Sequence, residues 1–208
     1  MTRAYTRPMP PQHLWEPGLG FARAAHLEEF VRAEFLTRGG LFFDAEHGHL
    51  SGASVGFLWA SSAHVDKGST KAGIAQLIRQ GEPRKWTVAA RAVWLQGMFG
   101  PALPTFLITL SAPVWARYDD RQAFALVDHE LCHCAVAKDE YGAPRFSDGT
   151  GQPVWCTRPH DHEGFVGTVD RWGAGAAGAA PLVSAALRAP RFAWVPGSHL
   201  DVYKACGT

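Results

Sequence analysis

Residues 129–133 read His-Glu-x-x-His, a set of residue types and spacings suited to metal-assisted hydrolysis. Two histidines four residues apart share one face of a helix, so His129 and His133 can bind a single metal ion. Glu130 then lies beside the ion without binding it, where its carboxylate can take a proton from water. The motif predicts a zinc ion (Zn2+) held by the two histidines, with Glu130 as catalytic general base.

The residues before the motif predict the helix that this spacing requires. Asp119 and Asp120 place acidic groups at the expected helix start, where exposed backbone N–H groups favour them. Apolar residues then recur three and four positions apart, roughly opposite the two histidines: Phe124, Val127, Leu131 and Cys134. One face of the predicted helix therefore packs into a core while the other carries the chemistry.

A catalytic zinc ion takes three protein ligands and leaves a fourth position for water. We expect the third ligand in a downstream polar cluster, at the start of a helix predicted from Pro159 to Gly173. The cluster consists of His160, Asp161, His162 and Glu163. His160 ranks first because imidazole is the commonest zinc ligand; Glu163 and His162 follow, and Asp161 is a candidate ligand or supporting residue. His160 and Glu163 share a helical face, so one can bind zinc while the other orients or protonates.

Other polar residues are secondary candidates. His47 and His49 would share one face of a strand, but a polar loop is the preferred interpretation because no third ligand lies nearby in sequence. Tyr141 and His162 are candidates to stabilise an oxyanion. The four cysteines form no regular framework and are interpreted as reduced thiols, the first three of them small and buried. They are Cys132, Cys134, Cys156 and Cys206.

Composition excludes several classes of protein. Apolar residues make up 47% and charged residues 19% of the 208 positions, which indicates a globular chain that can bury a core. The formal net charge of +1 encodes no general attraction to nucleic acid or to an anionic membrane. Neither a secretory signal nor a membrane-spanning stretch is recognised, so a cytoplasmic protein is expected.

The remaining sequence predicts an α+β domain with extensions. Helices are expected over 21–36 and 69–79, and strands over 84–95 and 105–110. The last of these could lie at a sheet edge, where it would hold an extended peptide, or inside the core. We predict an extended arm at residues 1–20, a main domain at 21–173, and a Gly/Ala-rich connector with a C-terminal extension at 174–208.

These motifs resemble the phage metallopeptidase family, zincin-like proteins encoded by bacteriophages and prophages. The resemblance rests on Asp-His-Glu-Leu-Cys-His-Cys at 128–134, Pro-His-Asp-x-Glu at 159–163, and Phe165-Val166 running to Trp172-Gly173, together with Trp115 and the strand before it. It covers about residues 84–173. It implies a minimal zincin-like fold, with His129 and His133 as zinc ligands, Glu130 as the catalytic glutamate, and His160 with Glu163 in the site. A phage protein of this kind would act in the cytoplasm of the host cell.

Two functions remain open at this point. The first is a zinc-dependent peptidase acting on peptides or proteins, without nucleic acid or membrane partners and with no oligomeric state indicated. The second is a non-catalytic, zinc-stabilised structural or host-interaction module, with a fourth protein ligand such as Cys156 or His162 in place of water. A nucleic-acid-guided peptidase of the SprT type is disfavoured by the near-neutral charge and the absence of paired Cys-x-x-Cys motifs.

Overall fold

The computed structural model describes residues 5–16, 18–66, 69–78, 86–164, 166–192 and 206–207. Contacts divide the chain into a larger unit, Met1–Arg158 with Gly197–Thr208, and a smaller unit, Pro159–Pro196. The boundaries predicted after residues 20 and 173 stay predictions.

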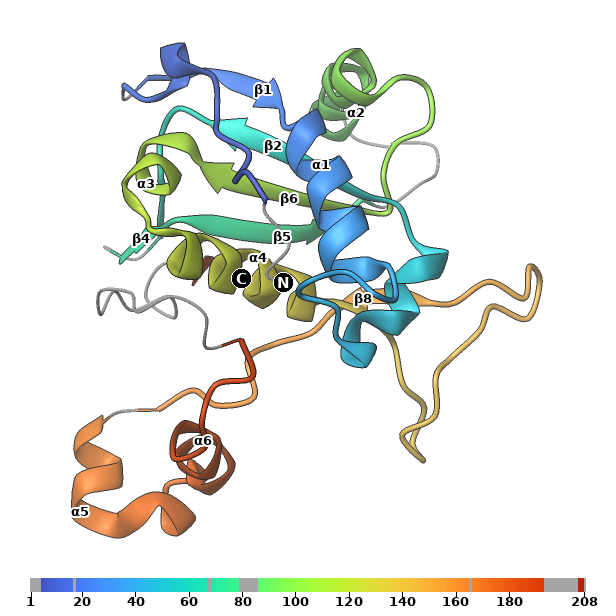
Figure 1. The fold of residues 1–208 in the computed structure, drawn as a ribbon. Coiled ribbons are helices and arrows are strands. Elements are labelled where there is room, and N and C mark those ends of the chain that lie inside the picture. The colour runs from blue at the N-terminus through green and yellow to red at the C-terminus, as the bar shows by residue number, and fades with distance from the viewer. Residues whose placement is uncertain are drawn as a thin grey trace. The chain divides into compact units, whose positions relative to one another are not determined.

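A five-stranded mixed sheet organises the larger unit, in the order β1-β2-β6-β5-β9 (Figure 1). Strand β2 pairs antiparallel with β1 and parallel with β6, and β5 pairs antiparallel with β6 and parallel with β9. The strands are β1 (Phe21–Arg23), β2 (Val55–Ala60), β5 (Gly73–Leu77), β6 (Phe106–Ser111) and β9 (Cys206–Gly207). A small hairpin joins β3 (His64–Asp66) to β4 (Ser69–Lys71). Strand β7 (Cys134–Val136) pairs antiparallel with β8 (Trp155–Thr157) across a longer connection.

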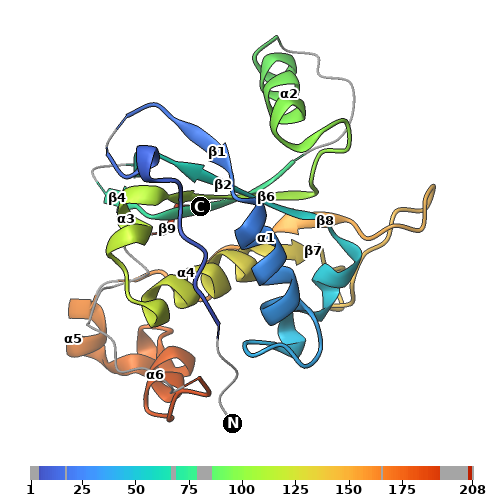
Figure 2. The ribbon, with the colours of Figure 1, turned by 45° about the horizontal axis from the view of Figure 1, so that its top comes forward.

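Helices cover both faces of the sheet (Figure 2). Helices α1 and α4 contact β2 and β5 on one face, whereas Leu95 of α2 packs with Leu58 and Leu107 on the other. The α-helices of this unit are α1 (Ala25–Val31), α2 (Trp86–Phe99), α3 (Ala112–Arg117) and α4 (Asp120–His133). Shorter helical turns are η1 (Gln12–Leu14), η2 (Arg32–Leu36) and η3 (Ala45–Gly52). The predicted α+β class is confirmed, with small sheets and helices compatible with a minimal zincin-like domain.

Strand β6 forms the centre of the core. Alternate side chains of a strand point to opposite faces, and Phe106, Ile108 and Leu110 are all fully buried on the face opposite Leu107. The strand predicted at 105–110 is therefore confirmed. It is an internal strand, because β2 and β5 pair with its two edges.

Three segments of the larger unit differ from the predicted secondary structure. The helix predicted over 21–36 begins only at Ala25, because residues 21–23 form β1. The helix predicted over 69–79 is wrong, because residues 69–71 and 73–77 form β4 and β5. The strand predicted over 84–95 is also wrong, since the described part of that segment lies in α2. The local sequence of 69–79 and of 84–95 suits either a helix or a strand. Pairing with β6 makes the first a strand, and packing of Leu95 against Leu107 holds the second as a helix.

The N-terminal arm is tied to the elements that carry the motif. The guanidinium of Arg7 donates to the Tyr118 carbonyl at 2.6 Å and pairs with Asp120 at 3.2 Å. The indole N–H of Trp115 donates to the Pro8 carbonyl at 3.0 Å. The described part of the arm therefore braces α3 and the start of α4.

The smaller unit contains α5 (Val166–Ala176) and α6 (Ala180–Ala186). The helix predicted from Pro159 to Gly173 is only partly right, because α5 begins at Val166 and bends at Gly173, which has φ of 77°. A side chain at Gly164 would meet the His162 ring at 2.8 Å, so that ring would have to move aside. Throughout the residues the structure describes, every helix is too short or too polar to cross a membrane.

Candidate metal centre

Helix α4 begins where the sequence predicted. Asp119 and Gln122 form a capping box, in which the Asp119 carboxylate accepts from the Gln122 N–H at 2.8 Å and the Gln122 side-chain carbonyl oxygen accepts from the Asp119 N–H at 3.0 Å. The apolar stripe predicted for this helix is buried; its members Phe124, Val127, Leu131 and Cys134 are at most 4% exposed. The cap and the packed stripe together fix the rotation of α4, and so the direction of its histidines.

The two motif histidines point at one position. Nε2 of His129 and Nε2 of His133 are 3.2 Å apart, and the two rings are inclined by 80°. Two nitrogens bound tetrahedrally to one zinc ion, each at about 2.0–2.1 Å, would be separated by about 3.3 Å. The pair therefore has the spacing of two ligands to one ion. A hydrogen bond between the rings would have a similar length, so metal analysis is the measurement that separates the two.

The backbone selects the tautomer of His133. Its Nδ1 lies 2.6 Å from the Arg158 carbonyl oxygen, and because a carbonyl only accepts, Nδ1 carries the proton. In the neutral ring Nε2 then presents a lone pair toward His129. Metal-binding histidines are commonly oriented by such a bond from the distal nitrogen. The carbonyl is positioned because β8 pairs with β7 directly after α4, and the Arg158 N–H donates back to the His133 carbonyl at 2.9 Å.

Glu130 lies between α4 and strand β5. Its side chain is fully buried, and a Cβ added to Gly73 would meet the Glu130 Cδ at 3.0 Å and its carboxylate oxygen more closely still. Glycine at position 73 thus lets the carboxylate rest against the strand. The sequence predicted a helix here, so this partner of Glu130 was missed, as was the Arg158 carbonyl.

The thiols close to the pair have separate environments. Burial raises the pKa of the Cys134 thiol far above its usual value, and the nearby Glu130 carboxylate raises it further. Burial also raises the pKa of Cys156. Without a bound metal, both groups are therefore protonated thiols at neutral pH.

His49 cannot serve as a metal ligand in this arrangement. Its Nε2 lies 2.6 Å from the Cys134 carbonyl and its Nδ1 lies 3.0 Å from the Glu46 carbonyl, so both ring nitrogens face backbone acceptors. His47 points instead to Asp128, with Nε2 at 2.9 Å from Oδ1. The two histidines of η3 therefore do not form a shared metal pair, and both fasten η3 to the end of α4.

The downstream polar cluster belongs to the smaller unit. Within that unit, Nδ1 of His160 lies 3.9 Å from the Glu163 carboxylate. Both residues precede α5, so the predicted rigid helical support is replaced by an irregular segment. Tyr141 belongs to the larger unit and is 87% exposed in the loop after β7. The roles predicted for these residues, and for Asp161 and His162, stay predictions.

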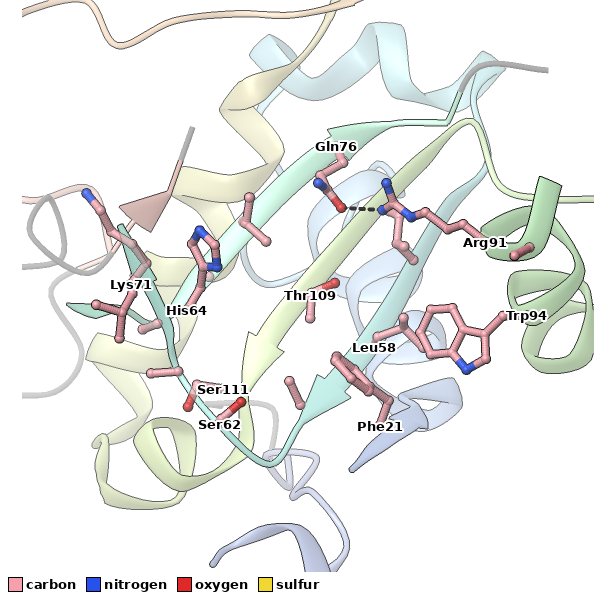
Figure 3. A pocket seen from close by; sticks show the side chains of 18 residues that line it. Phe21, Leu58, Ser62, His64, Lys71, Gln76, Arg91, Trp94, Thr109 and Ser111 are labelled. Atoms are coloured by element: carbon pink, nitrogen blue, oxygen red, sulfur yellow. Dashed lines mark hydrogen bonds between the residues drawn. The ribbon is translucent and has the colours of Figure 1, made fainter. Parts of the chain in front are cut away.

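A cavity of about 840 Å³ lies on the other face of the sheet (Figure 3). It lies between α2 and the β3–β4 hairpin, with Arg91 bonded to Gln76 at 2.6 Å on one wall and Lys71 on the other. Ile74 and Gln76 point into it, whereas Glu130 meets the opposite face of β5 at Gly73. No carboxylate is among its described lining residues. The cavity is therefore separate from the paired histidines.

An α+β scaffold that brings two histidines and a buried glutamate together on one helix defines a candidate metal-binding protein. A family model described as "Putative phage metallopeptidase" matches residues 28–188, more than half of the chain. The chain belongs to this family, which confirms the resemblance seen in its motifs. Comparison with curated proteins and with solved structures gave no match.

Proposed function

We propose that this protein is a zinc-dependent peptidase, with His129 and His133 as two zinc ligands and Glu130 as general base. The observation that carries the proposal is the facing pair of Nε2 atoms, 3.2 Å apart, with the His133 tautomer set by the Arg158 carbonyl. Family membership supports the same chemistry. Zinc, when bound, supplies Lewis acidity toward the scissile carbonyl and lowers the pKa of water in its open coordination position.

We propose His160 as the third ligand, because it follows closely in sequence a residue that contacts His133. The Arg158 carbonyl lies 2.6 Å from His133, and His160 follows only two residues later, so the Cα atoms of residues 158 and 160 are at most about 7 Å apart. The covalent chain thus keeps an imidazole within reach of the pair. Glu163, at 3.9 Å from His160, would orient its ring or replace it as ligand. Asp161 and His162 remain alternative ligands.

The reaction assigned to Glu130 is proton transfer. Its carboxylate takes a proton from the attacking water and delivers it to the leaving amine nitrogen, for which the carboxylate must be held in one position. The contact between its side chain and Gly73 provides that restraint. The substrate is a peptide or protein, and Tyr141 or His162 would assist the developing oxyanion.

The experiment is Glu130→Gln, with Glu140→Gln on an exposed loop as the matched control. We expect Glu130→Gln to retain zinc and to lose about 100- to 10,000-fold in peptide hydrolysis, the usual contribution of a general base. Hydrolysis is followed by mass spectrometry on a mixed peptide library, and zinc by elemental analysis. Unchanged turnover in Glu130→Gln would remove Glu130 from the mechanism.

One observation favours the non-catalytic alternative. The Glu130 carboxylate is fully buried, as expected of a structural site closed to water. A zinc-stabilised structural or host-interaction module would bind zinc through four protein ligands and hydrolyse nothing. Wild-type protein that holds zinc but cleaves no member of the peptide library would favour this function.

A further inference from the structure

A second group of metal-ligating side chains lies on the neighbouring face of α4. Asp128 and Cys132 are one helical turn apart, and His47 approaches them from η3. One donor atom from each of the three residues lies within 4.8 Å of the other two. All three residues belong to the larger unit, so this group is complete within it.

The packing around η3 fixes the position of the His47 ring. His47 is 3% exposed, and its Nε2 lies 2.9 Å from Oδ1 of Asp128. The Asp44 carboxylate caps η3 by accepting from the Glu46 N–H at 2.9 Å, and His49 holds the same segment to the end of α4. An incoming ion would therefore meet one preset ligand, while the Asp128 side chain, 46% exposed, has room to adjust.

The donor set is that of a thiophilic divalent metal. Imidazole, carboxylate and thiolate are the three ligand types that zinc accepts, and two ligands of a tetrahedral zinc ion are about 3.3–3.7 Å apart. Small side-chain shifts, on the order of 1 Å, would bring the present separations into that range. We propose that His47, Asp128 and Cys132 bind a second divalent ion of the zinc class, which ties η3 to the helix carrying His129 and His133. This inference does not depend on the peptidase proposal.

Two alternative roles for these three residues are distinguishable from a metal site. A cysteine nucleophile activated by a His–Asp pair would need the second ring nitrogen of His47 to bond the thiol. That nitrogen, Nδ1, is buried and has no hydrogen-bond partner among the described residues, so this arrangement is not formed. A purely structural bond between His47 and Asp128 makes no use of Cys132. The behaviour of Cys132 therefore decides between a metal site and a simple hydrogen bond.

The experiment loads the full chain with cobalt(II) in place of zinc. Cobalt bound to a thiolate shows a charge-transfer absorption in the near ultraviolet, which a site of nitrogen and oxygen ligands lacks. We expect this band in the wild type and its loss in Cys132→Ser, together with about one metal ion fewer per chain. Cys156→Ser is the matched control and should keep the band. The variant His129→Ala/His133→Ala should keep it too, which separates this site from the one proposed for catalysis.

A second measurement uses unaltered protein. Alkylation mapped by mass spectrometry should modify Cys132 slowly in the zinc-loaded chain and at least about 10-fold faster after chelation, because a coordinated thiolate is protected. Cys156 should react at the same rate in both states. Absence of the band from wild type, its persistence in Cys132→Ser, its loss in Cys156→Ser, or equal alkylation of Cys132 with and without metal would each overturn the proposal.

Discussion

Replacing Gly73 by alanine tests the contact that positions Glu130. The added Cβ would lie 3.0 Å from Glu130 Cδ, against the roughly 3.5–4.0 Å of favourable carbon contacts, so the carboxylate or β5 must move by about 0.5–1 Å. Overpacking of this kind costs about 1–3 kcal/mol of unfolding free energy. A general base displaced by about 1 Å would also lower hydrolysis by about 100-fold. Urea unfolding and peptide turnover measure the two effects.

Gly97→Ala is the matched control for this prediction. Gly97 lies inside α2, and a Cβ added there would meet nothing within 4 Å, so alanine should stabilise the protein by about 0.5–1 kcal/mol through helix propensity. The two glycine replacements are thus expected to change the unfolding free energy in opposite directions. A Gly73→Ala protein with wild-type stability and turnover would refute the inferred packing of Glu130 against β5.

Two further predictions concern the support of the site. Asp119→Ala removes the capping box of α4 and should cost about 0.5–2 kcal/mol, seen as a lower Tm. Burial raises the pKa of Tyr118 above its usual 10.0, so the unfolded chain ionises first and the contribution of Tyr118 to stability is lost as pH rises above 10. In Tyr118→Phe the unfolding free energy should therefore fall less steeply with pH, by at most about 1.4 kcal/mol per pH unit. Urea unfolding between about pH 9 and pH 11 measures this slope; the same slope in wild type and variant would contradict the prediction.

The sequence predicted α4 well because several local signals agree there. An acidic start, an apolar stripe at helical spacing and the motif itself all require the same helix, and the capping box at Asp119 confirms its beginning. Strand β6 was equally clear, since Phe106 to Leu110 combine branched and aromatic residues in one short run. In both places local preference and tertiary packing favour the same structure.

Other parts of the site depend on contacts distant in sequence. The segment containing Ile74 and Leu77 has apolar residues that suit either a helix or a strand, and its pairing with β6, a strand far along the chain, decides for a strand. The hydrogen bond from His133 to the Arg158 carbonyl requires the pairing of β7 with β8, which no short sequence motif predicts. Every residue carries a backbone carbonyl, and glycine occurs in many kinds of segment. The roles of Gly73 and Arg158 could therefore not be recognised from the sequence.

X-ray absorption at the zinc edge, recorded on the Cys132→Ser protein, identifies the atoms that surround the zinc ion proposed at His129 and His133. This variant lacks the proposed second site, so the signal reports the ion between His129 and His133. We predict one tightly bound zinc ion with only nitrogen and oxygen neighbours at about 2.0–2.1 Å, and its loss on further replacement of His133 by alanine. A sulfur neighbour at about 2.3 Å, or zinc content unchanged by loss of His133, would rule out a catalytic zinc ion shared by His129 and His133.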